Sequence, residues 1–358
     1  MQDTWPLLES FYKEKGLVRQ HLDSYNDFIE HKLQQVIDEA AGIELEIEGH
    51  SVKFGRIKLD KPRVKEADGS RPSILPNEGR LRNLTYSSPI YLEMILVESG
   101  REHQPVEVYI GEMPVMLKSK LCGLNGMSEG ELIAAGEDPL DPGGYFVING
   151  SERVIVTQED LASNSILVER DERAATEVAK VFSTHRGFRA LVIVERKKDG
   201  LLRVSFPAVP GHVQFVVLMR ALGLEKDREI VDAVSDDPEI VKELFENLQE
   251  AVEVKTKEEA LDLIGRRVAI GQTKEYRLQR AQEVLDRYLL PHIGSRPADR
   301  VQKAYYLGRM AERTIELALG RREVDDKDHY GNKRLKLAGD LLENVFRLAF
   351  INLTRDIK

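Results

Sequence analysis

Apolar residues recur at two different spacings along the 358-residue chain, and the spacing separates the predicted strands from the predicted helices. In the first part of the chain, alternating or nearly continuous apolar residues predict antiparallel strands over residues 43–47, 52–59, 90–97 and 106–117. Ahead of them, apolar residues three and four apart predict a helix over residues 24–37, with Asp23 or Ser24 as its N-cap. A capping box at Ser128 and Glu131 predicts a second, shorter helix.

In the second part of the chain the helical spacing dominates. A short polar helix is predicted over residues 172–182, followed by a hairpin of residues 189–195 and 202–206 that turns at Lys198-Asp199-Gly200. Six further helices are predicted over residues 213–222, 227–234, 238–250, 257–265, 274–289 and 298–319. A last helix has an apolar stripe from Ala338 to Leu353 and no capping residue before Lys358, so we expect its stripe to need a partner and the natural chain to continue.

These patterns predict an α+β fold of two domains. The first, over residues 1–182, is a mixed domain built on an antiparallel sheet. The second, over residues 183–358, is mostly α-helical and carries a small β-hairpin or sheet.

Composition narrows the class of protein. The chain is 32% charged and 42% hydrophobic, and it has no apolar run of the roughly 18 residues that a membrane span needs. Residues 1–15 lack a basic region followed by an apolar stretch, so we do not expect secretion, and the single cysteine, Cys122, excludes an internal disulfide. We therefore expect a cytoplasmic protein. A net charge of −9 argues against a protein that wraps nucleic acid, so any such contact must be local.

The segment of residues 143–159, GGYFVINGSERVIVTQE, predicts a hairpin that turns at Asn149-Gly150. It resembles the corresponding segment of the second-largest, β-like subunit of multisubunit DNA-directed RNA polymerases in their archaeal and eukaryotic form. Residues 16–28, 80–89 and 111–117 resemble other segments of that family, in the same order.

The resemblance implies that the chain is the N-terminal part of such a subunit, about a third of its length. It would comprise an incomplete protrusion domain over residues 1–182 and a lobe domain over residues 183–358, which together form one side of the DNA cleft in transcription. It also implies partners: the largest subunit, the rest of the second-largest subunit, DNA and RNA, transcription factor B and a NusG-like elongation factor.

The charged tract of residues 325–335, DDKDHYGNKRL, is a candidate site. A calcium loop is excluded, because the required glycine and terminal glutamate are not at that loop's spacing. One interpretation is a solvated acidic loop. The other comes from the resemblance, which places Asp328 at a base edge and Lys333, with Arg334 as a further candidate, beside the non-template strand. Leu161 departs from the arginine that bacterial relatives have on that side.

Two arginine pairs, Arg186 with Arg189 and Arg266 with Arg267, are the other clustered basic groups. Each pair could contact DNA phosphates, or could solvate a loop and complement the carbonyl end of a helix. Arg80 and Arg82 are instead expected to hold the fold by pairing with local carboxylates.

No arrangement of catalytic residues is evident, and Gly143-Gly144 precedes a strand where a phosphate loop precedes a helix. We expect no cofactor or metal here. By the resemblance, the polymerase's catalytic Mg²⁺ is held by the largest subunit, and the active-centre lysines lie beyond Lys358, so nucleotidyl transfer belongs to the whole enzyme. The alternative is a stand-alone scaffold that binds a protein through the stripe of its last helix. An independent hydrolase or transferase lacks any supporting residues.

Overall fold

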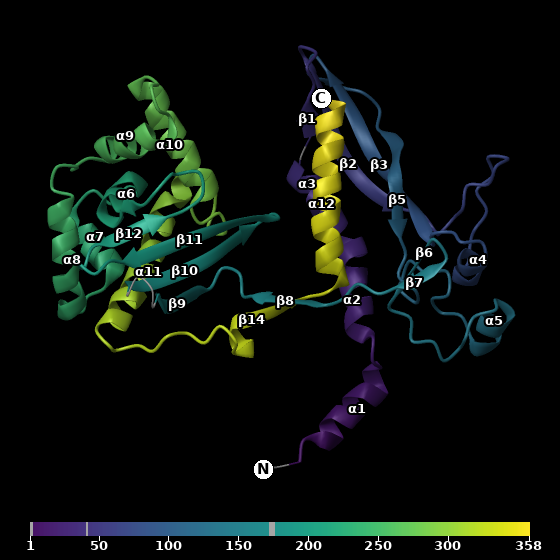
Figure 1. The fold of residues 1–358 in the computed structure, drawn as a ribbon. Helices are drawn as coiled ribbons and strands as arrows, with labels where there is room; N and C mark the ends of the chain where they lie inside the picture. Colours follow the sequence, from purple (N-terminus) through teal and green to yellow (C-terminus); the bar gives the residue numbers. More distant parts are fainter. Residues whose placement is uncertain (1–2, 41, 172–175) are drawn as a thin grey trace. The chain divides into compact units, whose positions relative to one another are not determined.

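A computed structural model describes residues 3–40, 42–171 and 176–358 of the chain (Figure 1). Helices and antiparallel sheets are mixed in it, which confirms the predicted α+β class. The chain forms two compact units. Unit 1 consists of Met1–Asp160 together with Leu335–Lys358, and unit 2 is the continuous segment Leu161–Arg334.

This division differs from the expected boundary between residues 182 and 183, which falls inside strand β10 (Thr176–His185). β10 pairs along its length with β11 (Phe188–Arg196), from Glu177 opposite Arg196 to His185 opposite Phe188. The predicted helix over residues 172–182 is wrong for residues 176–182, which are strand, and residues 172–175 lie outside the described part. Val178, Ala179 and Val181 are buried in the sheet, and this burial outweighs a local composition that favours helix.

Unit 1 is built on an antiparallel sheet whose strands correspond to the predicted ones. Its order is β1-β2-β3-β4, and β5 pairs with β3 alongside β4. The strands are β1 (Gly42–Glu44), β2 (His50–Leu59), β3 (Ser87–Glu98), β4 (Arg101–Glu102) and β5 (Val106–Pro114). Helix α1 (Trp5–Lys15) precedes this sheet in the chain, and none of its residues is buried.

The predicted helix over residues 24–37 is part of a longer helical segment. It consists of α2 (Arg19–Asp27), a π-helical turn η1 (Phe28–Lys32) and α3 (Leu33–Ala40). The apolar face is as predicted, with Tyr25, Phe28, Leu33, Val36 and Ile37 all buried. The N-cap prediction is wrong, because the helix already begins at Arg19, and the Ser24 hydroxyl instead accepts a hydrogen bond from the Gly339 N–H at 3.0 Å.

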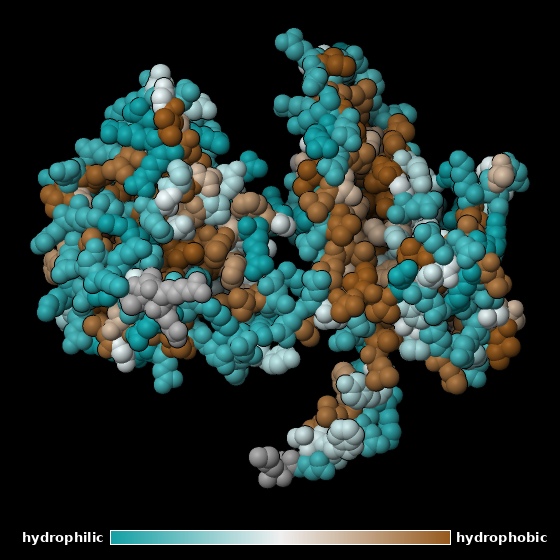
Figure 2. All heavy atoms as spheres, viewed as in Figure 1, coloured by the Kyte–Doolittle hydropathy of each residue, from teal (hydrophilic) through white to brown (hydrophobic). Residues whose placement is uncertain are grey.

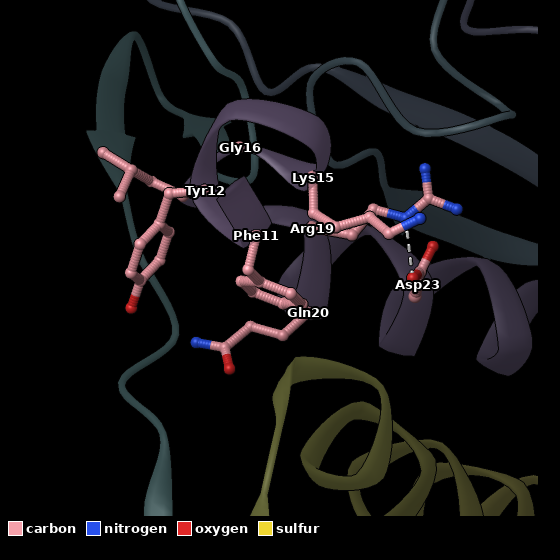
Figure 3. Close-up of a pocket in the computed structure, with 8 residues that line it drawn as sticks. Phe11, Tyr12, Lys15, Gly16, Arg19, Gln20 and Asp23 are labelled. Carbon is pink, nitrogen blue, oxygen red and sulfur yellow. Dashed lines mark hydrogen bonds and ion pairs between the residues drawn. The ribbon is translucent and has the colours of Figure 1, made fainter. Parts of the chain in front are cut away.

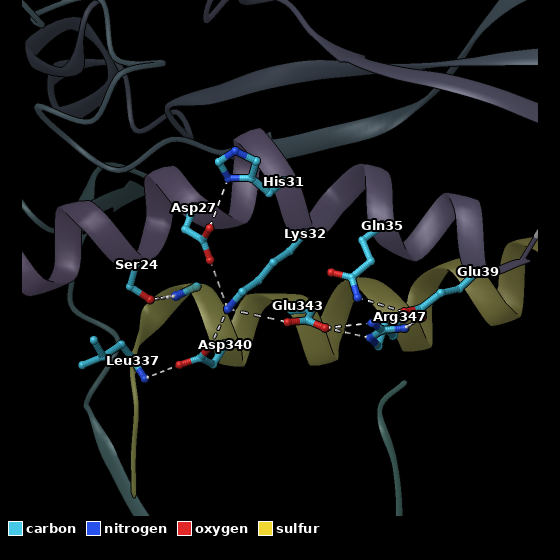
Figure 4. Close-up of polar contacts among 11 residues, drawn as sticks. Ser24, Asp27, His31, Lys32, Gln35, Glu39, Leu337, Asp340, Glu343 and Arg347 are labelled. Atoms are coloured by element: carbon cyan, nitrogen blue, oxygen red, sulfur yellow. Dashed lines mark hydrogen bonds and ion pairs between the residues drawn. The ribbon is translucent and has the colours of Figure 1, made fainter. Parts of the chain in front are cut away.

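The last helix, α12 (Ala338–Ile357), packs in unit 1, although it was assigned to the second domain (Figure 4). The Lys32 ammonium lies 2.6 Å from Asp340, and the Arg347 guanidinium contacts both Glu39 and Glu343. Phe346 and Phe350 are buried in the same core as Tyr25 and Phe28. This core supplies the partner that the stripe was expected to need.

Part of α12 nevertheless stays open to solvent. Val345, Leu348 and Ile351 are each more than half exposed, and Figure 2 shows hydrophobic atoms over this helix. The stripe is therefore only partly covered by the described residues.

The hairpin at Asn149-Gly150 is confirmed but is shorter than predicted. It pairs β6 (Phe146–Ile148) with β7 (Ser151–Arg153), and the two turn residues have φ values of 49° and 76°. Val154 and Val156, expected in the second strand, are exposed. The short helices α4 (Pro76–Leu81) and α5 (Glu129–Ala134) belong to the same unit. The capping box of α5 is present as predicted, with the Ser128 N–H donating to Glu131 at 2.7 Å.

Unit 2 is a five-stranded antiparallel sheet with helices on one face. Its order is β13-β12-β11-β10-β9, and the strands not yet named are β9 (Ile166–Asp171), β12 (Leu202–Ser205) and β13 (Val213–Gln214). The predicted hairpin of β11 and β12 is confirmed. The helices are α6 (Phe215–Leu222), α7 (Asp227–Val234), α8 (Pro238–Glu250), α9 (Lys257–Val268), α10 (Lys274–Tyr288), the 3-10 turn η2 (Pro297–Asp299) and α11 (Arg300–Ala318). All six predicted helices of this part are therefore present.

The chain passes between the units twice, and the two passing segments pair with each other. They are β8 (Gln158–Leu161) and β14 (Lys333–Lys336), the latter preceded by the 3-10 turn η3 (Tyr330–Asn332). None of the helices in the described ranges is long and apolar enough to span a membrane.

Candidate nucleic-acid interface

Asp325, the first residue of the tract 325–335, fastens the tract to the sheet of unit 2. The Asp325 N–H donates to the Val168 carbonyl of β9, and the Val168 N–H donates to the Asp325 carboxylate, both at 2.8 Å. Asp326 accepts from the Asp328 N–H at 2.8 Å, and Asp325 also pairs with Arg322. The start of the tract is thus bonded to β9, the edge strand of the sheet. Within the described ranges, no three His, Cys, Asp or Glu side chains gather to hold a metal ion.

The structure brings Asp328 and Lys333 together. The Lys333 ammonium lies 3.4 Å from the Asp328 carboxylate, whose side chain is 94% exposed. Arg334 is exposed, and its guanidinium donates to the carbonyls of Gly331 and Lys333 at 3.0 and 2.7 Å. The Asp328 carboxylate is therefore accessible to a hydrogen-bond donor from another molecule.

The sequence analysis did not name two lysines as candidates, one beside this tract and one within it. Lys180 of β10 and Lys327 of the tract both contact the carboxylate of Glu169, one at each oxygen. Burial, together with the nearby Lys327 ammonium, lowers the pKa of Lys180. One carboxylate cannot neutralise two ammonium groups, so this cluster has a surplus positive charge. No local motif joins residues so far apart, and residue 180 lay in a segment predicted as helix.

Arg189 lies on the same face of the sheet as Lys180. It is paired with Thr184, which is four residues along β10 from Lys180, or about 13 Å, on the same side of the strand. The guanidinium of Arg189 stacks on the Phe182 ring at 4.3 Å. Arg186 lies in the adjoining turn with a φ of 49°. Lys180, Arg189 and Lys327 therefore belong to one surface, which we call the cationic sheet face, and Lys333 follows Lys327 in the same tract.

The second arginine pair lies elsewhere, in the helical layer. Arg266 pairs with Asp262 of its own helix at 2.8 Å, and Arg277 of α10 contacts the same carboxylate. Arg267 donates to the His212 carbonyl at 2.6 Å, next to β13. Because β13 and β9 are opposite edges of the five-stranded sheet, about 19 Å separates this place from the tract. Arg266 and Arg267 thus contact protein groups away from the cationic sheet face.

Arg80 and Arg82 hold the fold of unit 1, as expected. Arg80 pairs with Glu137 at 2.8 Å and with Glu152 at 2.9 Å. Arg82 pairs with Glu66 at 2.8 Å and with Glu78 at 2.6 Å.

Two other places have some features of a reactive site. A hollow of about 420 Å³ at α1 and α2 is lined by Phe11, Tyr12 and Gln20, and its Arg19 and Asp23 pair with each other at 2.8 Å (Figure 3).

In unit 2, the Ser183 hydroxyl lies 2.7 Å from Nδ1 of His292, a distance suited to a nucleophile and its base. However, Ser183 is completely buried, and its oxygen also accepts from the His292 N–H. This pair therefore fastens a loop to β10.

Comparisons with known proteins agree on one family. Residues 16–358 match the family model described as RNA polymerase beta subunit. The chain is 54% identical to DNA-directed RNA polymerase subunit Rpo2 of Saccharolobus solfataricus, over its whole length and 32% of that relative. It is 55% identical to subunit Rpo2N of Methanococcus vannielii, over 98% of the chain and 72% of that relative. With Rpo2N of Halobacterium salinarum the identity is 52%, over the whole chain and 71% of that relative. The chain thus spans about a third of the length of the first of these relatives.

Proposed function

The chain belongs to the RNA polymerase beta subunit family, as the N-terminal part of the second-largest subunit, and we propose that it forms one side of the DNA cleft of a DNA-directed RNA polymerase. Unit 1 would correspond to the protrusion and unit 2 to the lobe. The family match does not support the alternative of a stand-alone scaffold.

The observation that carries this proposal is the cationic sheet face. On a chain with a net charge of −9, it places Lys180 and Lys327 on the carboxylate of Glu169, with Arg189 about 13 Å away along β10 and Lys333 in the same tract as Lys327. Ammonium and guanidinium groups neutralise phosphates without reading sequence, which is the contact that a cleft wall needs. The exposed Asp328 carboxylate could accept from a base amino group, as cytosine offers.

The rest of the assembly follows from the family. We infer that the partners are the largest subunit, the remainder of the second-largest subunit, DNA and RNA, together with transcription factor B and a NusG-like elongation factor, and that the assembly works in the cytoplasm. Catalytic Mg²⁺ would be held by the largest subunit, and this chain would position nucleic acid without taking part in phosphoryl transfer.

The test uses the assembled polymerase with Lys327→Gln in this subunit, because Lys180 still neutralises Glu169 in that variant. We expect shorter-lived open complexes and a slope of log affinity against log salt that is smaller by about 1 for each phosphate that the variant no longer neutralises. Lys333→Ala and Arg334→Ala should act in the same direction. The control is Lys242→Gln, an exposed lysine of α8. A slope equal to that of the control would remove the cationic sheet face from the cleft.

A further inference from the structure

The tip of the β10–β11 hairpin carries an exposed aromatic ring in a fixed place. Arg186 and Gly187 form a two-residue turn with φ values of 49° and 73°, and His185 pairs with Phe188 directly after it. This turn type continues the twist of both strands, so it does not splay them. Phe188 is 41% exposed although it points to the same side of β11 as the buried Ala190 and Val192.

A second ring and a cation meet Phe188 from α10. Tyr288, the last residue of that helix, packs against Phe188 edge to face, with ring centres 5.7 Å apart and planes at 72°. The exposed Arg287 guanidinium lies 5.7 Å from the centre of the Tyr288 ring. Among the described residues Arg287 has no hydrogen bond or ion pair, and the adjacent Asp286 carboxylate is taken by Arg300 at 2.6 and 2.7 Å.

The protein core beneath Phe188, Tyr288 and Arg287 is closely packed and holds the end of α10 in place. Leu285 of α10 and Leu289, the residue that follows the helix, have no exposed surface. The Lys303 ammonium donates to the carbonyls of Leu285 and Asp286 at 2.9 and 2.7 Å, which fixes the end of the helix. The two rings are therefore held in place before any ligand arrives, and little side-chain entropy is lost on binding.

We propose that Phe188, Tyr288 and Arg287 form a stacking platform for an unpaired base of single-stranded nucleic acid. In an edge-to-face pair, the ring that presents its edge keeps both of its faces off its partner, so a base can stack there. An unpaired guanidinium beside it adds attraction to the base face and to the phosphate. The platform deepens the proposed function, on which it rests, by assigning a place where a separated DNA strand is held through its bases.

Other ligands fit this arrangement less well. A duplex keeps its bases stacked inside, so it could use Arg287 but could not use the rings. An acidic peptide would likewise use only the cation. The two rings therefore favour a single strand.

The experiment measures binding of the 358-residue chain to fluorescein-labelled single-stranded oligothymidine and to a duplex of equal length. Phe188→Leu removes the π-face and keeps an apolar side chain against Tyr288, and Arg287→Gln removes the charge. Phe245→Leu is the matched control, because Phe245 is a phenylalanine on α8 that is at least as accessible as Phe188, with 55% of its surface exposed. We expect Phe188→Leu to weaken single-strand binding roughly tenfold and duplex binding hardly at all. Phe245→Leu should change neither.

A 2-aminopurine base in the oligonucleotide reports stacking directly, and its fluorescence should be quenched by the chain and restored by Phe188→Leu. Unchanged single-strand affinity in Phe188→Leu, or an equal loss for single strand and duplex, would overturn the platform. So would competition by polyglutamate as strong as that by oligothymidine. Failure of the proposed function shows separately, as an unaltered salt slope in Lys327→Gln, because stacking hardly contributes to that slope.

Discussion

Lys303 is a lysine without any exposed surface, placed where a helix ends in the core of unit 2. Its ammonium satisfies two of the last carbonyls of α10, which have no partner within the helix, and a cation at that end also complements the helix dipole. Burial lowers the pKa of Lys303 to about 8. The neutral amine can still donate both hydrogen bonds, so losing the proton removes the desolvation penalty without removing the cap.

The stability of unit 2 should therefore depend on Lys303 in alkaline solution. Below pH 8 the folded and unfolded states are both protonated, and the full penalty of burying the charge is present. Between pH 8 and the ordinary lysine pKa of 10.5, the unfolded state binds more protons, so stability rises with pH. We expect the free energy of unfolding of the wild type, measured in urea, to gain on the order of 2 kcal/mol over that of Lys303→Met from pH 7 to pH 10.

The Lys303→Met variant serves as the reference in that measurement because it cannot titrate, although it leaves two carbonyls without a donor and should be less stable at every pH. A constant difference between the two proteins across this range would show that Lys303 keeps its proton when folded.

Helices far apart in sequence are joined where a glycine allows close approach. Gly339, in the first turn of α12, lies against α2, and a Cβ at this position would be 2.0 Å from the Ser24 carbonyl oxygen. Gly130 of α5 is also helical, but a Cβ there would meet nothing within 4 Å. The same residue type therefore has opposite roles in two helices of unit 1.

This contrast predicts opposite effects of one substitution. Gly130→Ala should leave unit 1 unchanged or stabilise it by up to about 1 kcal/mol, because alanine favours the helix. Gly339→Ala should destabilise it by roughly 2 kcal/mol or more, because α12 must move away from α2 and the shared core. Thermal unfolding of the two variants side by side checks this. Equal midpoints would mean that α12 is not packed closely against α2.

The two units differ in how the chain supplies them. Unit 2 is one continuous segment with its own core, whereas unit 1 needs both ends of the chain, because Phe346 and Phe350 of α12 complete the core around Tyr25 and Phe28. A continuous segment with a closed core meets the conditions for independent folding.

A fragment of residues 161–334 should therefore fold alone and unfold cooperatively in urea, with a far-UV circular dichroism spectrum of a mixed protein. A fragment of residues 183–358, cut at the boundary expected from the sequence, should not. It lacks β9 and most of β10, and it exposes the apolar side of α12. Cooperative unfolding of the second fragment at similar stability would contradict this division into units.

Features set by neighbouring residues were predictable. The turn at Asn149-Gly150, the capping box at Ser128 and the bounds of α8, which begins after Asp237 at a proline, all depend on contacts within a few positions. The family resemblance, carried by residues 143–159, was confirmed for the same reason, since it needs only the order of residues. The candidate residues Asp328 and Lys333 could be named in this way, as members of one tract.

Contacts between distant segments could not be predicted, and they account for the differences in the division into units, in β10 and in the cationic sheet face. Lys180 and Lys327 meet only because the tract runs beside β9, and no pattern within either segment records that pairing. Residues 176–182 became a strand because β9 and β11 supply hydrogen-bond partners on both sides. α12 belongs to unit 1 because its apolar side packs against the core formed by α2 and α3. The local order of residues thus determined most helices, the turns and the family. Burial and strand pairing between distant segments determined the division into units and brought together the residues of the cationic sheet face.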